Sequence, residues 1–163
     1  METKRELAKT KIASLKEALQ EITSLSTNED KSEFTIKYLC KQLDAGFGII
    51  YLTNNSDKAD FLEYSGGYAF HKPKGDSSKI LFGEGLTGQV AKSQKSIIID
   101  QLNTNNITIF SGLGNSSPKS IIITPILKDG LTIGVIEIAS FQKTTVYDKQ
   151  FVEASAQILS AEF

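Results

Sequence analysis

The chain has little cysteine or histidine, almost no net charge and no long hydrophobic run. Its single cysteine, Cys40, cannot form an internal disulfide, and one cysteine with one histidine, His71, cannot complete a structural zinc site. We therefore expect no metal-dependent chemistry and no cofactor. No apolar run approaches the roughly 20 residues of a membrane span, and the charged N-terminus lacks the apolar core of a secretory signal. These absences predict a cytoplasmic protein with no membrane insertion in this segment.

The charge balance argues against a nucleic-acid partner. The formal net charge is -1, and the Lys and Arg residues are not gathered into a strip. At 163 residues with 40% hydrophobic content, the chain is long enough for one well-cored domain plus an appendage. We expect residues 1–26 to form an N-terminal signalling or dimerisation helix and residues 27–163 to form the domain.

The segment from Lys4 to about Ser24 is charged, free of Gly and Pro, and predicted as a helix. Apolar residues recur along it at alternating spacings of four and three, at Ala8, Ile12, Leu15, Leu19 and Ile22. This spacing fits a short seam for a second subunit, and it fits a helix that lies on its own domain equally well. Both interpretations stay open.

The strongest local signal is the stretch from Ser120 to Phe141, two apolar runs joined by Asp129-Gly130. Both residues of this dipeptide tolerate positive φ, which predicts a two-residue type I′ turn between antiparallel strands. Ile, Val and Thr crowd both faces of both runs, so the hairpin should be covered on both sides. Glu137 breaks the pattern, because a buried carboxylate needs a partner or a polar cavity. Its role is open between a pocket-facing hydrogen bonder and a buried structural partner.

The rest of the chain predicts an antiparallel sheet with helices on one face, an α+β fold. Ser26 with Glu29 and Thr27 with Asp30 both offer an N-cap for a second helix that stops at Gly46, and Thr145 with Asp148 should open a last one. No stop signal precedes Phe163, so we expect that helix to run on and the chain to be a fragment of a longer protein. Further elements are expected at Gly46–Asn54 and Asp60–Phe70 (a hairpin with Gly66-Gly67 as a bulge or close approach), Ile80–Phe82 (strand), Leu86–Ser93 (helix) and Ser96–Ile99 (strand).

The segment from Gln101 to Lys119 is nearly uncharged and rich in Asn, Ser, Gly and Thr. A loop of this length is usually functional or mobile. Because apolar residues are interleaved in it, we expect it to fold back over the sheet. Together with the Leu86–Ser93 helix it would enclose a pocket.

Two other features are weighed as structural. Gly83-Glu84-Gly85-Leu86-Thr87-Gly88 matches the glycine pattern of dinucleotide-binding turns, but the helix after it is short and no βαβ repeat surrounds it. We expect these glycines to let the chain turn tightly into a helix over the sheet. Cys40 is expected to pack in the interior and His71 to be a solvated loop residue.

Several segments in the right order resemble the GAF domain, particularly those of bacterial sensor histidine kinases and chemotaxis-type receptors. They are FGEGLTGQVAKSQKSIII, NITIFSGLGNSSPKSIIITPIL, GVIEIASF and TTVYDKQFVEASAQIL. The resemblance implies a sheet of about six antiparallel strands, with the first and last helices on one face and a ligand pocket on the other. It also implies that the terminal helices join those of a second subunit in a homodimer and signal to an output domain in the same polypeptide.

Mapped by segment, the resemblance implies a pocket for a small molecule that is not identified. The ligand-binding residues would be Leu86, Thr87, Val90, Phe110, Ser111, Gly112, Leu113, Ser120, Ile122 and Glu137. The function implied is a sensor domain without catalytic residues. The alternatives are a small enzyme of the same fold, of the free methionine sulfoxide reductase type, and a ligand-free dimerisation module. Because reductases of that type need several cysteines, the single Cys40 weakens the enzyme alternative.

Overall fold

The computed structural model describes residues 3–54, 60–70, 79–100, 109–111 and 114–163, with the backbone alone at 109–111 and 114–116. The helices are α1 (Lys4–Ser24), α2 (Asn28–Leu43), α3 (Gly85–Ser93) and α4 (Val146–Leu159). The strands are β1 (Phe47–Thr53), β2 (Phe61–Tyr68), β3 (Lys79–Leu81), β4 (Ile97–Asp100), β5 (Ile109–Ser111), β6 (Gly114–Ser116), β7 (Ser120–Lys128) and β8 (Leu131–Ser140). Within this part of the chain, no helix is long and apolar enough to cross a lipid bilayer.

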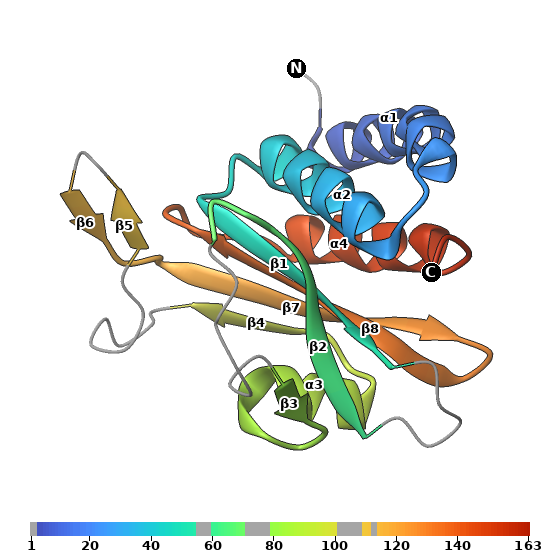
Figure 1. Cartoon of the computed structure of the whole chain (residues 1–163). Coiled ribbons are helices and arrows are strands. Elements are labelled where there is room, and N and C mark those ends of the chain that lie inside the picture. The colour runs from blue at the N-terminus through green and yellow to red at the C-terminus, as the bar shows by residue number, and fades with distance from the viewer. Residues whose placement is uncertain (1–2, 55–59, 71–78, 101–108, 112–113) are drawn as a thin grey trace.

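Six strands form one sheet in the order β3-β2-β1-β8-β7-β4, and every neighbouring pair is antiparallel. Helices α1, α2 and α4 lie on one side of this sheet, and α3 lies on the other (Figure 1). The β7–β8 hairpin is central, as its doubly apolar strands predicted. The expected α+β fold, with about six antiparallel strands and the terminal helices on one face, is confirmed.

The local signals at the hairpin and at the helix starts are confirmed. Asp129 and Gly130 have φ angles of 51° and 78°, as a type I′ turn requires. Of the two caps expected for α2, the structure uses Thr27, which accepts a hydrogen bond from the Asp30 amide, and Thr145 and Asp148 form a reciprocal capping box at α4. Short polar side chains here satisfy amides that the first helical turn leaves without partners.

Two predicted helix ends are wrong. Helix α2 ends at Leu43 and is capped by Asp44, which takes the left-handed conformation at φ 52°, while Gly46 lies close against the Phe141 ring. Helix α4 ends at Leu159, and Phe163 packs against the helix-side core. The turn after α4 is held by Glu162, which accepts hydrogen bonds from Thr23 and Lys31.

The seam of α1 is used within the chain. Helix α1 packs against α4 and α2. Its seam residues Leu15 and Ile22 are fully buried, and Ile12 packs against the helix-side core. Because these side chains are already covered, they are not available to a second subunit in this arrangement. The interpretation of α1 as a helix lying on its own domain is the one that the structure bears out.

The sheet separates two apolar clusters. The helix-side core joins α2 and α4 to the sheet, and its buried members include Cys40, Ile50, Ile122, Ile136 and Phe151. The α3-side core lies on the opposite face and includes Phe47, Leu62, Val90, Ile121, Ile123 and Val135. Strand residues alternate between the two clusters, as the period of two requires.

The segment expected to cover the sheet, Gln101 to Lys119, contains a ribbon formed by β5 and β6. In Figure 1 this ribbon extends beyond the end of β7 and lies well apart from α3. Its backbone therefore does not cover the middle of the sheet beside α3. Residues 101–108 and 112–113 of this segment lie outside the described residues. That they cover the sheet therefore stays a prediction.

A candidate ligand site between helix α3 and the sheet

Glu137 is a carboxylate set into the apolar face of the sheet that α3 covers. It pairs across the sheet with Ile49 of β1 and with Ile123 of β7, both members of the α3-side core. Glu137 is partly exposed to solvent, and its carboxyl group is nevertheless largely desolvated by the surrounding protein. Burial raises the pKa of the Glu137 carboxyl, and the hydrogen bond from Thr87 opposes part of that rise. An acid in this place is destabilising to the empty fold, so it is a candidate for function.

Thr87 on α3 is the hydrogen-bond partner of this acid. Its hydroxyl oxygen Oγ1 donates to Oε2 of Glu137 at 2.9 Å. Within the described residues, no donor reaches the second oxygen, Oε1, and no Lys or Arg pairs with the carboxylate. One oxygen of Glu137 is thus held in place by the protein, and the other is available to a ligand.

The glycine-rich turn before α3 brings Thr87 to the sheet. Gly83 and Gly85 have φ angles of 92° and 58°, which L side chains rarely adopt. A Cβ at Gly88 would collide with the Leu81 carbonyl oxygen, so only glycine lets α3 approach β3 this closely. The expectation that these glycines shape a tight entry into a helix is confirmed.

Helix α3 is tied to the β7–β8 hairpin at its other end. The Thr132 hydroxyl donates to the Ala91 carbonyl oxygen at 2.7 Å, and the Gln94 side-chain amide donates to the Gly130 carbonyl oxygen at 2.8 Å. Val90 and Ala91 pack into the α3-side core. These contacts fix α3 over the strand that carries Glu137.

Aromatic side chains line the same face of the sheet beside Glu137. Tyr51 and Tyr64 face each other across β1 and β2, and Phe70 lies 6.2 Å from both Tyr64 and Phe47, measured between ring centroids. Burial raises the pKa of the Tyr51 phenol, and the nearby Glu137 and Tyr64 add to that rise. Sequence reasoning missed this group, although Phe47, Ile49 and Tyr51 alternate along the predicted strand and share one face.

The structure brings together only part of the predicted site. Thr87, Val90 and Glu137 lie on the α3 side of the sheet. Leu86 is also on α3 but is 45% exposed, so Thr87 and Val90 form the part of the helix that faces the sheet. Phe110 and Ser111 lie in the β5–β6 ribbon, and Gly112 and Leu113 lie outside the described residues.

The predicted placement of Ser120 and Ile122 in the pocket floor is wrong. Ile122 belongs to the helix-side core. Ser120 occupies the same face, since its hydroxyl donates to the Gln142 carbonyl oxygen at 2.8 Å and accepts from the Thr144 amide at 3.2 Å. Both residues therefore lie on the face opposite to Glu137, where Ser120 holds the connection into α4.

Cys40 lies far from this site in the fold. It is fully buried in the helix-side core, which confirms the prediction that it packs in the interior. Burial raises the pKa of its thiol to about 12, so the thiol is protonated near neutral pH. His71 lies outside the described residues.

Comparison with known proteins identifies the surrounding fold. A family model described as the GAF domain matches residues 29–161. No curated protein matches the chain in a comparison of sequences.

Solved structures share the fold at low sequence identity. A GAF domain from a phosphoenolpyruvate-protein phosphotransferase (ptsP) of Coxiella burnetii has a TM-score of 0.75 at 19% identity, covering 95% of this chain and 93% of that one. The A. aeolicus nlh2 GAF domain in an inactive state has a TM-score of 0.69 at 19% identity, covering 96% and 97%. Free methionine-R-sulfoxide reductase from Neisseria meningitidis, in complex with its substrate, has a TM-score of 0.68 at 19% identity, covering 98% and 87%.

Proposed function

The chain belongs to the GAF domain family, and we propose that it is a regulatory domain that binds a small molecule without transforming it. The observation that carries this proposal is the Glu137–Thr87 pair, which sits between α3 and an otherwise apolar sheet face. Desolvation of this carboxylate lowers the stability of the unliganded domain, whereas a donor bound at its second oxygen would stabilise the charge. Its position therefore supports a role in ligand recognition.

The path from this site to the terminal helices is short. Glu137 lies near the end of β8, and Gln142 follows that strand in the connection to α4. The Gln142 amide donates to the Ser140 hydroxyl at 3.1 Å, and the hydroxyl of Ser120 in β7 holds both Gln142 and Thr144. We propose that ligand occupancy is relayed along this route to α4 and α1, and on to an output domain of a bacterial signal-transduction protein. Such a relay requires the ligand to bind two helix arrangements with different affinity.

A ligand screen on the whole chain tests the proposal. We expect compounds that raise the melting temperature to shift the NMR amide signals of Thr87 and Glu137, and to slow hydrogen exchange in α4. At a concentration about 100 times its Kd, a ligand should stabilise the fold by about 2.7 kcal/mol.

Three outcomes of the screen would contradict the proposal. Compounds that bind but shift the NMR amide signals of residues outside α3 and β8 would contradict the proposed position of the site. Hits that the protein converts to product would make it an enzyme. The absence of any ligand, in the screen and in native mass spectrometry of gently purified protein, would favour a ligand-free dimerisation module.

The enzyme alternative draws on the likeness to the methionine sulfoxide reductase fold. A thiol-dependent reaction on a ligand bound beside Glu137 would need Cys40, the only cysteine of the sequence. That thiol lies on the other side of the sheet and is protonated near neutral pH. These observations support a binding role over a thiol-dependent reaction.

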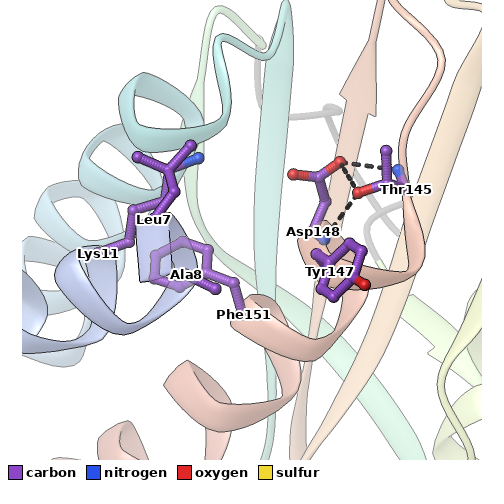
Figure 2. A pocket seen from close by; sticks show the side chains of 7 residues that line it. All are labelled: Leu7, Ala8, Lys11, Thr145, Tyr147, Asp148 and Phe151. Carbon is purple, nitrogen blue, oxygen red and sulfur yellow. Dashed lines mark hydrogen bonds between the residues drawn. The ribbon is translucent and has the colours of Figure 1, made fainter. Parts of the chain in front are cut away.

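We also propose that the domain is a homodimer through its terminal helices. With Leu15 and Ile22 buried inside the chain, the available apolar surface of α1 is at its N-terminal end. Leu7 there is 45% exposed and lines a hollow of about 130 Å³ with Tyr147 and Phe151 of α4 (Figure 2). Lys11 borders the same hollow, with its Nζ 5.9 Å from the Phe151 ring centroid. We propose that the second subunit packs against this hollow.

Replacing Leu7 with lysine tests the dimer. We expect the wild-type chain to sediment as a dimer and Leu7→Lys to sediment as a monomer, because a charge would be desolvated in an apolar contact. Leu131→Lys is the matched control, since Leu131 is 61% exposed at the tip of the β7–β8 hairpin. A monomeric wild type, or an unchanged mass in Leu7→Lys, would contradict the assignment.

A further inference from the structure

The groups around Glu137 define which ligand chemistry the site accepts. The sheet contributes Ile49, Ile123, Val135 and Ala139, and α3 contributes Thr87 and Val90. The aromatic group described above adds phenol and phenyl rings beside this acid. Thus the face offers one carboxylate, the Thr87 hydroxyl that already donates to it, the phenols of Tyr51 and Tyr64, and apolar surface elsewhere.

Resting on the proposed function, we propose that the ligand is a small organic cation whose ammonium or amidinium group pairs with Oε1 of Glu137. An apolar or aromatic body on the same ligand would lie against the neighbouring rings. Thr87 acts as a positioning residue, because its hydrogen bond holds Oε2 and leaves Oε1 directed to the ligand. The bond formed is a charge-assisted N–H···O hydrogen bond, the strong class of hydrogen bond in proteins.

The charges of the described residues favour a cation over the other ligand classes. No Lys or Arg among these residues pairs with Glu137, so an anionic ligand would face an acid without a compensating charge. A neutral ligand can donate only an uncharged hydrogen bond to Oε1. A cation gains the ion pair, and an aromatic ring attracts a cation that lies over its face within about 6 Å, so rings such as Tyr51 near the acid favour this class further. The raised pKa of Glu137 agrees with a site that lacks its positive partner.

Three probes of similar size separate these classes: benzylamine, benzyl alcohol and benzoate. Each is titrated into the whole chain and followed by the NMR amide signals of Thr87 and Glu137. We expect benzylamine to bind at least about tenfold more tightly than benzyl alcohol, and benzoate to show no binding. In Glu137→Gln, benzylamine and benzyl alcohol should bind within about twofold of each other, because the charge is gone and the shape is kept.

Glu153→Gln is the matched control, since Glu153 lies on the surface of α4 and pairs with Lys149 at 3.3 Å. This variant should keep the full preference for benzylamine. Equal or tighter binding of benzyl alcohol or benzoate at Thr87 and Glu137 would overturn the cation assignment and leave the proposed binding site in place. If none of the three probes binds, the assignment is also overturned, whereas the ligand screen decides separately whether the site binds any small molecule.

Discussion

Replacing Leu15 with alanine should lower the free energy of unfolding by about 2–5 kcal/mol, the cost of a cavity at a fully buried leucine. Leu15 has no exposed surface, and α1 packs against α4 and α2. The loss arises within one chain, because these contacts are intramolecular. Urea denaturation followed by circular dichroism measures it, and the midpoint shift should be the same at low and high protein concentration.

Leu131→Ala is the control, because Leu131 is 61% exposed and should change stability by no more than about 0.5 kcal/mol. If Leu15→Ala had as little effect as this control, α1 would not be part of the folded domain in solution. A loss that appeared only at high protein concentration would return Leu15 to a seam between subunits, since dimer stability depends on concentration. Either result would contradict the packing of α1.

The ambiguity of α1 shows what a periodic pattern leaves undecided. The spacing from Ala8 to Ile22 predicted the helix and the face that is buried, and both are correct. The same apolar face could pack against a second subunit or against the rest of its own domain, because both present an apolar surface. Only the docking of α1 on α4, a contact between the two ends of the chain, decides it. Contacts of that range leave no local signal in the sequence.

The hairpin turn and the helix starts were predicted correctly, because their causes lie within a few residues, whereas two helix ends were not. The Asp129-Gly130 turn and the Thr27 and Thr145 caps each depend on neighbours up to three positions away. Glu137 was singled out by its contrast with the apolar strand around it. The sequence thus indicated the acid of the candidate site, although not its partner Thr87.

A β-bulge in the hairpin decides which face of the sheet Ile122 occupies relative to Glu137. Lys128 pairs with Leu131 next to the turn, and regular pairing from there would place Ile122 opposite Glu137. The register shifts between Ile126 and Leu127, so Glu137 pairs with Ile123 instead. A shift of one residue moves a side chain to the opposite face of a sheet. A strand that is apolar on both faces gives no pattern from which such a bulge is predicted.

Replacing Glu137 with glutamine should stabilise the unliganded domain, and the gain should grow with pH. Burial raises the pKa of this carboxyl in the folded state, so between the unfolded and folded pKa values the folded chain holds a proton that the unfolded chain has lost. Wild-type stability therefore falls as pH rises through this window. Glutamine keeps the shape and still accepts the Thr87 hydrogen bond, but it has no charge to bury.

The comparison is made by thermal denaturation at about pH 4, below the window in which the wild type loses stability, and at about pH 8. At the lower pH the two proteins should have nearly equal stability, because Glu137 is neutral in both states. At the higher pH Glu137→Gln should melt at least about 2 °C above wild type. The surface variant Glu153→Gln should change stability by less than about 1 kcal/mol at either pH. A glutamine variant less stable than wild type at the higher pH would mean that Glu137 has a positive partner inside the protein, and the site would then be closed to a cationic ligand.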